Sequence, residues 1–274
     1  MSFFTGTLYS DTLHMDTNLG VILPQDSRFH RYPDLGIAPG VKPRAKPKTF
    51  ILLHGLSDNY SVWEHRTSLL RYAEFYDAAI LLPEVQRSFY LDMKNGPAYF
   101  TYIAEELPKL ASELFNISVT PQDLYIGGLS MGGYGAMLAA LTHPEKYAGA
   151  GCFSGAYDIK GLVAMSQVPV PDPVLALIVA GMDKDMRAVF GEDYKVPDSA
   201  DVFTLLPRAA KSPHRPDFYL ACGTEDVLYP ANTAMRDALK AAGFKVAYEE
   251  WPGIHEWGFW DTAIQKMFKH FLTP

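Results

Sequence analysis

Short apolar runs recur along the chain, each followed by a stretch suited to a helix, and this alternation constrains the fold more than any other feature. The runs are TFILLHG, AAILLPE, DLYIGG, AGAGCFSG, DFYLACG and, less apolar, KVAYEEW. A short apolar run bounded by turn residues is typical of a strand that is buried on both faces. Because strands that alternate with helices form mainly parallel sheets, the sequence predicts an α/β protein with helices on both faces.

The expected elements can be placed along the chain by the same patterns. Helices are expected at about 61–74, 97–115, directly after Ser130, 231–242, and from about Trp257 onward. The first two segments, GTLYSDTLHMD and NLGVILPQD, alternate like two antiparallel strands with a turn near Thr17 and Asn18. This N-terminal hairpin makes the predicted sheet mixed.

One long segment, at about 158–213, interrupts the alternation because it contains no obvious strand. An excursion of this length between two strands is more often functional than disordered, so we expect a lid or pocket wall. A helical decoration that only packs against the sheet is the alternative. Gly191 is expected to end a helix within it. With 274 residues, the chain fits a single domain, 1–274, that carries this insert.

Composition excludes several classes of partner. The net charge is -7, and acidic and basic residues are mixed along the chain, so no basic face for nucleic acid or anionic lipid is expected. No run of about 18 apolar residues and no signal-peptide pattern occurs, which predicts a cytoplasmic protein that does not engage a membrane. Two cysteines, Cys152 and Cys222, are too few for a disulfide framework and are expected to be buried.

The stretch 125–135, YIGGLSMGGYG, carries the strongest motif. The spacing of its glycines fits neither the Gly-x-Gly-x-x-Gly of dinucleotide-binding turns nor the P-loop, which needs Lys after its last glycine. It does fit Gly-x-Ser-x-Gly, with Ser130 at the centre between an expected strand and an expected helix. The prediction is therefore a sharp strand-to-helix turn that exposes the serine hydroxyl.

This turn has a physical rationale. The serine must adopt a strained backbone conformation, and Gly128 and Gly132 are expected because side chains there would collide with the adjoining strand or helix. The backbone N–H of Met131 is left unpaired at the start of a helix, where it can stabilise a developing oxyanion.

A serine nucleophile needs a general base and a carboxylate that orients the base. In this type of sheet the partners follow in the order Ser, Asp or Glu, His, each after a later strand. Asp226 follows DFYLACG and His255 follows KVAYEEW, so Ser130, Asp226 and His255 are the predicted triad. Glu225 is the main rival for the orienting acid.

A second oxyanion donor is expected after the first buried run. TFILLHG ends with His54 and Gly55, so the backbone N–H of Leu56 is the candidate that faces the N–H of Met131. His54 is expected to shape this loop rather than act as a second base.

Taken together, these segments resemble the α/β-hydrolase superfamily and, within it, the esterase D and tributyrin-esterase group, whose relatives include S-formylglutathione hydrolases and some feruloyl esterases. The resemblance rests on LLHGLSDNYSVWEHRT, YIAEELPKL, IGGLSMGGYGAMLAALTHPEKYAGAGCFSGAYD, CGTEDVLYPAN and GIHEWGFWD. It covers nearly the whole chain. S-formylglutathione hydrolases usually carry GLTCT where this chain has GLSDN, so the chain looks closer to the tributyrin esterases.

The resemblance implies a serine carboxylesterase for short acyl chains, acetyl or feruloyl esters among them, that acts through an acyl-enzyme without metal or cofactor. Two alternatives stay open: a thioesterase of the S-formylglutathione hydrolase type, and an acyltransferase that uses the same acyl-enzyme. The expected partner is a small-molecule ester substrate, and the sequence leaves open whether the chain forms a homo-oligomer.

Overall fold

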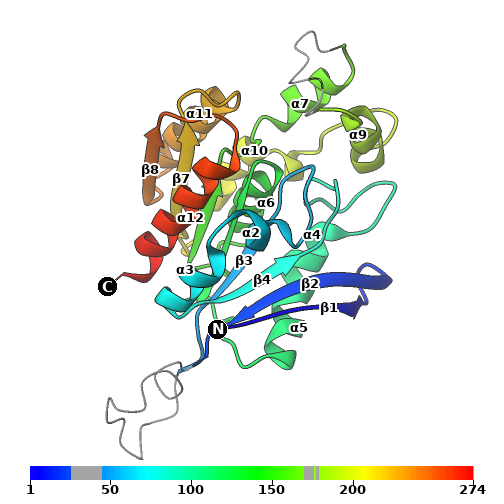
Figure 1. Ribbon diagram of the computed structural model, residues 1–274. Coiled ribbons are helices and arrows are strands. Elements are labelled where there is room, and N and C mark those ends of the chain that lie inside the picture. The colour runs from blue at the N-terminus through cyan, green and yellow to red at the C-terminus, as the bar shows by residue number, and fades with distance from the viewer. Residues whose placement is uncertain (26–44, 170–175, 177–178, 274) are drawn as a thin grey trace, which may run out of the picture.

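A single eight-stranded sheet organises the molecule, and the computed structural model describes it over residues 1–25, 45–169, 176 and 179–273 (Figure 1). The strand order is β1-β2-β4-β3-β5-β6-β7-β8. From β4 to β8 all neighbours are parallel, whereas β1 and β2 pair antiparallel with each other and β2 pairs antiparallel with β4. The predicted mixed α/β sheet is confirmed. The strands are β1 (Ser2–Ser10), β2 (Met15–Leu23), β3 (Thr49–Leu53), β4 (Ala79–Pro83), β5 (Leu124–Leu129), β6 (Gly149–Phe153), β7 (Asp217–Gly223) and β8 (Val246–Trp251).

Helices cover both faces because the central strands are apolar on both sides. In β3, Ile51 and Leu53 belong to one buried cluster and Phe50 and Leu52 to the other. The first cluster includes residues of α5, α6, α10 and α11, and the second includes residues of α2, α3 and α12. The helical elements are α2 (Val62–Arg66), α3 (Leu69–Tyr76), α4 (Tyr99–Thr101), the π-helical η2 (Tyr102–Glu106), α5 (Leu107–Leu114), α6 (Met131–Thr142), α7 (Ile159–Ser166), α9 (Met182–Phe190), the 3-10 turn η3 (Asp198–Ala200), α10 (Val202–Ala209), α11 (Tyr229–Ala241) and α12 (Trp257–Leu272).

The helix expected at about 61–74 is two helices, α2 and α3, with a break at Thr67 and Ser68. Two polar contacts end the first helix there. The Thr67 hydroxyl donates to the Trp63 carbonyl at 2.5 Å, and the Ser68 N–H donates to Asp261 Oδ1 at 2.9 Å. Side chains of Ser, Thr and Asp offer backbone groups such alternatives to helical bonds. Periodicity alone does not reveal the partner, because Asp261 lies on α12.

The hairpin turn is not where the alternation predicted it. β1 ends at Ser10 and β2 begins at Met15, while Thr17 pairs with Leu8 and Asn18 pairs with Thr7 inside the ladder. The predicted turn near Thr17 and Asn18 is therefore wrong, although the hairpin itself is confirmed.

Glu106, far away in sequence, explains the true position of the turn. Its carboxylate accepts hydrogen bonds from the Ser10 hydroxyl at 2.5 Å and from the N–H groups of Asp11 at 2.8 Å and Thr12 at 3.3 Å. The Leu13 N–H donates to the Ser10 hydroxyl oxygen at 3.0 Å. One carboxylate thus satisfies the backbone donors that a tight turn leaves unpaired. Desolvation raises the pKa of Glu106, but the hydrogen bonds from Ser10, Thr12 and Asp11 outweigh it and hold the pKa below its usual value.

The described part of the predicted insert, which omits residues 170–175 and 177–178, contains α7, α9, η3 and α10 and no strand. Gly191 follows α9 with φ of 87°, a conformation that suits glycine, and confirms the predicted helix end. Backbone bonds fix α9 to the loop after β4: the N–H groups of Lys94 and Asn95 donate to the carbonyls of Val189 and Ala188, both at 2.9 Å. In Figure 1, α7 and α9 project beyond one end of the sheet.

We predict that Glu106→Gln destabilises the fold by about 1 kcal/mol at pH 7, because a neutral amide accepts the turn's hydrogen bonds more weakly. The depressed pKa means that this stabilisation is present above the unfolded-state pKa and is lost as the pH falls through the lower, folded-state pKa. Urea unfolding of both proteins at several pH values measures it. The difference should shrink below about pH 4. Glu113→Gln, an exposed change on α5, is the control, and an equal effect from it would contradict the prediction.

Candidate active site

Ser130 lies in the turn between β5 and α6, with φ of 53° and ψ of -117°. This conformation is strained for a residue with a side chain. Hydrogen bonds on both sides hold it: the Ser130 N–H donates to the Phe153 carbonyl at 2.9 Å, and the Ala156 N–H donates to the Ser130 carbonyl at 3.1 Å. Both partners belong to β6 and the loop after it. The neighbouring strand therefore fixes the strained turn.

The glycines on either side of Ser130 are needed for space. A Cβ at Gly132 would lie 2.4 Å from the carbonyl oxygen of Leu53, and one at Gly128 would lie 2.6 Å from the carbonyl carbon of Gly132. Real Cβ atoms do not approach backbone so closely. The first turn of α6 is thus pressed against the ends of β3 and β5, as the motif predicted.

Asp226 and His255 come together after β7 and β8, which are adjacent parallel strands. His255 Nδ1 and Asp226 Oδ2 are 2.9 Å apart, and the Asp226 side chain is fully buried. Glu225, the rival acid, instead accepts a hydrogen bond from the Gly253 N–H at 2.7 Å. Because β5 and β6 continue the same parallel sheet, Ser130 follows its strand at the same edge. In the described chain no hydrogen bond joins the Ser130 hydroxyl to His255.

Asp226 is held as a carboxylate by its neighbours. Burial raises its pKa, but the hydrogen bond and charge of His255, the Leu228 N–H and the Ser154 hydroxyl lower it by more, so the net pKa lies below the ordinary value. Leu228 N–H donates to Asp226 Oδ1 at 2.8 Å. An ionised carboxylate here is what stabilises a protonated imidazole.

Ser154 and Trp260 are parts of this site that the sequence patterns did not indicate. The Trp260 indole N–H donates to the Ser154 hydroxyl at 3.1 Å, which leaves the hydroxyl hydrogen free to bond Asp226. The Trp260 ring also packs edge-on against His255, with ring centres 4.8 Å apart. Ser154 follows the apolar run of β6 directly, as Ser130 follows β5, and has φ of 47°. That repeated strand-to-serine pattern was the available clue.

The loop after β3 is shaped by His54. Its Nε2 accepts the Val85 N–H at 3.2 Å, so Nδ1 carries the hydrogen that faces the Gly55 carbonyl at 2.8 Å. Tyr90 donates its hydroxyl to the His54 carbonyl at 2.8 Å. Because backbone groups bond both ring nitrogens, His54 has the loop-shaping role that the sequence predicted. Among the described residues, neither the Leu56 N–H nor the Met131 N–H has a hydrogen-bond partner.

Two other groups contact this loop. The Gly55 N–H donates to Asp58 Oδ2 at 3.2 Å, and Asp58 is close enough to His255 to feel its charge. Burial raises the pKa of Asp58 despite the opposing effects of His54, Gly55, Arg66 and His255. Arg87 ties the loop to the insert, because its guanidinium binds Asp185 at 2.8 Å, the Ala180 carbonyl at 2.9 Å and, more weakly, the Leu56 carbonyl at 3.5 Å.

A groove of about 460 Å³ lies beside the Asp226 loop. It is bounded by α7 of the insert, by the start of α11 and by the residues that follow Asp226. Its lining is mostly apolar, a composition suited to the uncharged part of a ligand. The lining residues are Ala156, Asp158, Gly161, Leu162, Met165, Phe203, Val227, Leu228, Pro230, Ala231 and Ala234.

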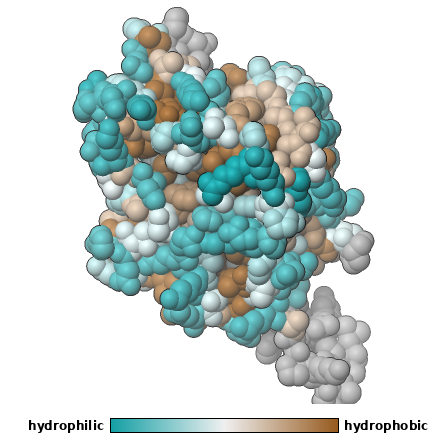
Figure 2. Space-filling view, turned by 180° about the vertical axis from the view of Figure 1, so that it is seen from behind, coloured by the Kyte–Doolittle hydropathy of each residue, from teal (hydrophilic) through white to brown (hydrophobic). Residues whose placement is uncertain are grey.

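Other kinds of site find little support in the described residues. No group of three or more His, Cys, Asp or Glu side chains there is placed to hold a metal ion, and none of the described helices is long and apolar enough to cross a membrane. On the face shown in Figure 2, hydrophilic residues are interspersed with separate apolar patches. Burial raises the pKa of both Cys152 and Cys222 to about 12, so neither thiol is a ready nucleophile.

The parallel sheet, the strained serine between strand and helix, and the His–Asp pair after the last two strands define the class as the α/β-hydrolase fold. Comparison with known families agrees. A family model described as "Putative esterase" matches residues 10–271. The chain belongs to this esterase family.

Similar proteins extend this result. An acetyl esterase of Caldicellulosiruptor saccharolyticus is 29% identical over 282 residues, which cover 98% of this chain and 97% of that protein. The substrate-bound structure of FphF, a fluorophosphonate-binding serine hydrolase of Staphylococcus aureus, superposes with a TM-score of 0.83 at 28% identity, over 100% of this chain and 99% of that one. The S-formylglutathione hydrolase FrmB of Staphylococcus aureus superposes with a TM-score of 0.80 at 29% identity, over 99% of both chains. The protein is a carboxylic ester hydrolase.

Proposed function

We propose that the protein is a serine carboxylesterase that hydrolyses short-chain acyl esters, acetyl esters foremost, with Ser130 as nucleophile, His255 as general base and Asp226 as the orienting acid. The observation that supports this best is the 2.9 Å contact between His255 Nδ1 and Asp226 Oδ2 at the sheet edge that also carries the strained Ser130. The contact selects the imidazole tautomer that leaves Nε2 without a hydrogen.

In the first half of the proposed reaction, the Ser130 hydroxyl oxygen attacks the ester carbonyl carbon while His255 Nε2 accepts the hydroxyl proton. The carbonyl electron pair moves to oxygen and forms an oxyanion. Collapse of this intermediate breaks the bond to the alcohol, which takes the proton from Nε2, and leaves an acyl group on Ser130. In the second half, water gives its proton to Nε2 and attacks the acyl carbon, so that the carboxylic acid leaves and Ser130 recovers its proton.

The proposed oxyanion donors are the backbone N–H groups of Leu56 and Met131. Met131 is the first residue of α6, so its N–H also lies at the positive end of the helix dipole. Neither donor has a partner among the described residues, which agrees with a site that is preorganised for charge developing on the substrate. Arg87 and Asp58 contact the loop that carries Leu56 and would act on the donor N–H only through the backbone of that loop.

Ser154 and Trp260 have a positioning role in this proposal. The indole N–H bonds the Ser154 hydroxyl, and this hydroxyl helps His255 and Leu228 to lower the pKa of Asp226. A buried carboxylate with its lone pairs occupied stays ionised and keeps one orientation.

Short, neutral acyl esters are proposed as substrates on two grounds. The acetyl esterase of Caldicellulosiruptor saccharolyticus matches almost the whole chain. In addition, Asp58 places a carboxylate in the donor loop within electrostatic reach of His255, which disfavours anionic substrates. The similarity to the S-formylglutathione hydrolase FrmB favours a thioesterase as second candidate.

Replacing Ser130 by Ala should lower kcat/KM for p-nitrophenyl acetate by more than about 10³-fold, because no acyl-enzyme can form. A fluorophosphonate probe should label the wild type, and peptide mapping should find the label on Ser130. Ser112→Ala, a change of a half-buried serine on α5 whose hydroxyl bonds the Lys109 carbonyl, should leave the rate and the labelling unchanged. Labelling of the Ser130→Ala protein at another residue would refute the assignment.

The adjacent acids Glu225 and Asp226 give a matched pair of substitutions. Asp226→Asn should lower kcat by about 10³–10⁴-fold with little change in KM, because an amide favours the wrong imidazole tautomer. Glu225→Gln should keep activity within about threefold, since its carboxylate bonds only the Gly253 backbone. Steady-state kinetics measure kcat and KM for both variants. A larger loss of kcat in Glu225→Gln than in Asp226→Asn would assign the orienting role to Glu225.

A substrate panel separates the two candidate functions. We expect kcat/KM to fall along p-nitrophenyl acetate, butyrate and octanoate, and methyl ferulate and S-formylglutathione to be poorer substrates than the acetate by about tenfold or more. Asp58→Asn should improve S-formylglutathione turnover more than acetate turnover. A wild-type preference for S-formylglutathione would make the thioesterase the better assignment.

A further inference from the structure

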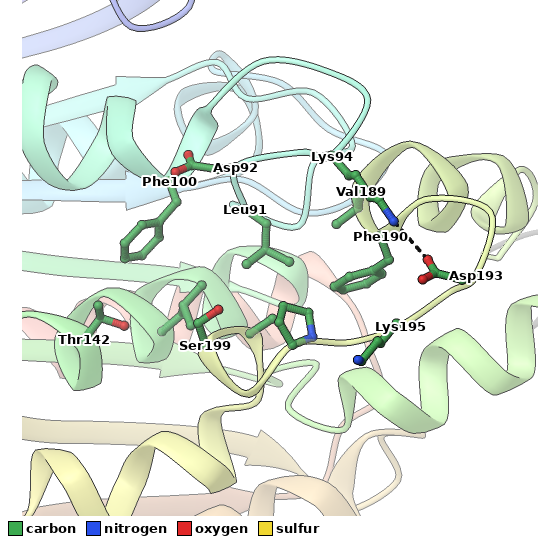
Figure 3. A pocket seen from close by; sticks show the side chains of 13 residues that line it. Leu91, Asp92, Lys94, Phe100, Thr142, Val189, Phe190, Asp193, Lys195 and Ser199 are labelled. Carbon is green, nitrogen blue, oxygen red and sulfur yellow. Dashed lines mark hydrogen bonds and ion pairs between the residues drawn. The ribbon is translucent and has the colours of Figure 1, made fainter.

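A second cavity, of about 490 Å³, lies apart from the candidate active site (Figure 3). It is enclosed by the second half of α6, the loop after β4 and the segment that joins α9 to η3. Along α6, Leu138 and Thr142 lie roughly 10 and 16 Å beyond Met131, at about 1.5 Å per residue. The lining residues are Leu91, Asp92, Lys94, Phe100, Leu138, Thr142, Val189, Phe190, Asp193, Lys195, Pro197, Ser199 and Ala200.

The interior of this cavity is apolar. In Figure 3, Leu91, Phe100 and Phe190 extend from one wall toward the opposite wall, which carries Thr142 and Ser199. Two aromatic rings and several aliphatic side chains in a space of this size are typical of a site for a small organic molecule. Covering an apolar lining of this kind with the apolar body of a ligand removes it from water, which favours binding.

The charged residues at the rim are not equivalent. Asp92 is engaged by Thr101, whose N–H and hydroxyl donate to its two carboxylate oxygens at 2.9 and 2.7 Å. Lys94 and Asp193 pair with each other at 3.1 Å, as the dashed line in Figure 3 shows. Lys195 has no ion pair or hydrogen bond from its side chain in the described part of the chain. Among the described rim groups, Lys195 is therefore the charged group with free hydrogen-bonding atoms, because the Asp92 carboxylate, which has no cationic partner there, has both oxygens bonded to Thr101.

We propose that this cavity is a second binding site, for a monocarboxylate with an apolar body of about six to ten carbons. The body fills the space between Phe100 and Phe190, and the carboxylate reaches the ammonium group of Lys195 at the rim. The free ammonium donors of Lys195 suit a carboxylate, whereas both oxygens of Asp92 are already bonded to Thr101.

The test uses octanoate as ligand, with octanamide and octylammonium as neutral and cationic analogues of the same length. Methyl-labelled leucine and valine report where the ligand binds, because Leu91, Leu138 and Val189 line this cavity whereas Val227 and Leu228 line the groove beside Asp226. Titrations followed by NMR shifts give a Kd for each location. The readout needs no catalysis, so it is independent of the role proposed for Ser130.

We expect octanoate to shift the Leu91, Leu138 and Val189 methyls and to bind there about two- to fivefold more tightly than octanamide, the range of an exposed ion pair. Lys195→Gln should remove that preference and Lys195→Glu should reverse it, while octanamide binding stays the same. Lys211→Gln, a change of another exposed lysine, is the control. Ser199→Trp, at the exposed rim, should fill the space and weaken both ligands by about tenfold or more.

Four outcomes would overturn the proposal. The first three are the absence of shifts at these methyls at millimolar octanoate, equal affinity for octanoate and octylammonium, and octanoate binding that survives both Lys195→Glu and Ser199→Trp. Shifts confined to the Val227 and Leu228 methyls would also overturn it, because they would place the carboxylate in the groove beside Asp226.

Discussion

The close approach of α6 to the ends of β3 and β5 is the constraint on which the candidate site depends. Backbone meets backbone there, and no side chain fits at Gly128 or Gly132. The strain of Ser130 is sustained because its N–H and carbonyl are both bonded to the segment at the end of β6. The same packing starts α6 beside the loop after β3, so the N–H groups of Met131 and Leu56, which have no partner in the described part of the chain, lie at one edge of the sheet. A rigid backbone contact, rather than a flexible glycine loop, thus determines the geometry.

Burial of Asp226 is the second constraint. Burial disfavours the charged form of this carboxyl unless hydrogen-bond donors and positive charge compensate for the lost water. Desolvation alone favours the neutral acid, which would be a poor partner for an imidazolium. His255, Leu228 and Ser154 supply enough donors to reverse that preference. Each of these partners comes from a different segment, and Trp260 of α12 contacts two of them, Ser154 by a hydrogen bond and His255 by ring packing. The folding of the C-terminal half is therefore coupled to the ionisation of one carboxylate.

The sheet, the order of its parallel strands along the chain and the N-terminal hairpin could be predicted, because buried strands and turns leave local patterns. The positions of turns and helix ends that depend on residues far away in the sequence could not be predicted. The hairpin turn follows Glu106, which lies on another element, and the helix break at Thr67 depends on Asp261. The strand-turn-helix motif around Ser130 and the order of Asp226 and His255 along the chain could also be predicted, because they are local or sequential features. Ser154 follows an apolar run as Ser130 does, but its contacts with Trp260 and Asp226 cannot be read from that local pattern.

The insert shows how such remote contacts connect parts of the molecule that the sequence treats as separate. Arg87 binds Asp185 on α9 and also reaches the carbonyl of Leu56. One turn further along α9, Val189 and Phe190 form a wall of the cavity that Lys195 borders. A helix of nine residues therefore lines the proposed carboxylate site directly and is connected to the loop of a proposed oxyanion donor through Arg87. Since packed helices move as units, a ligand that shifted α9 at one end would alter the Arg87 contact at the other. The insert is in this respect a structural link between the two sites, which a purely decorative helix would not provide.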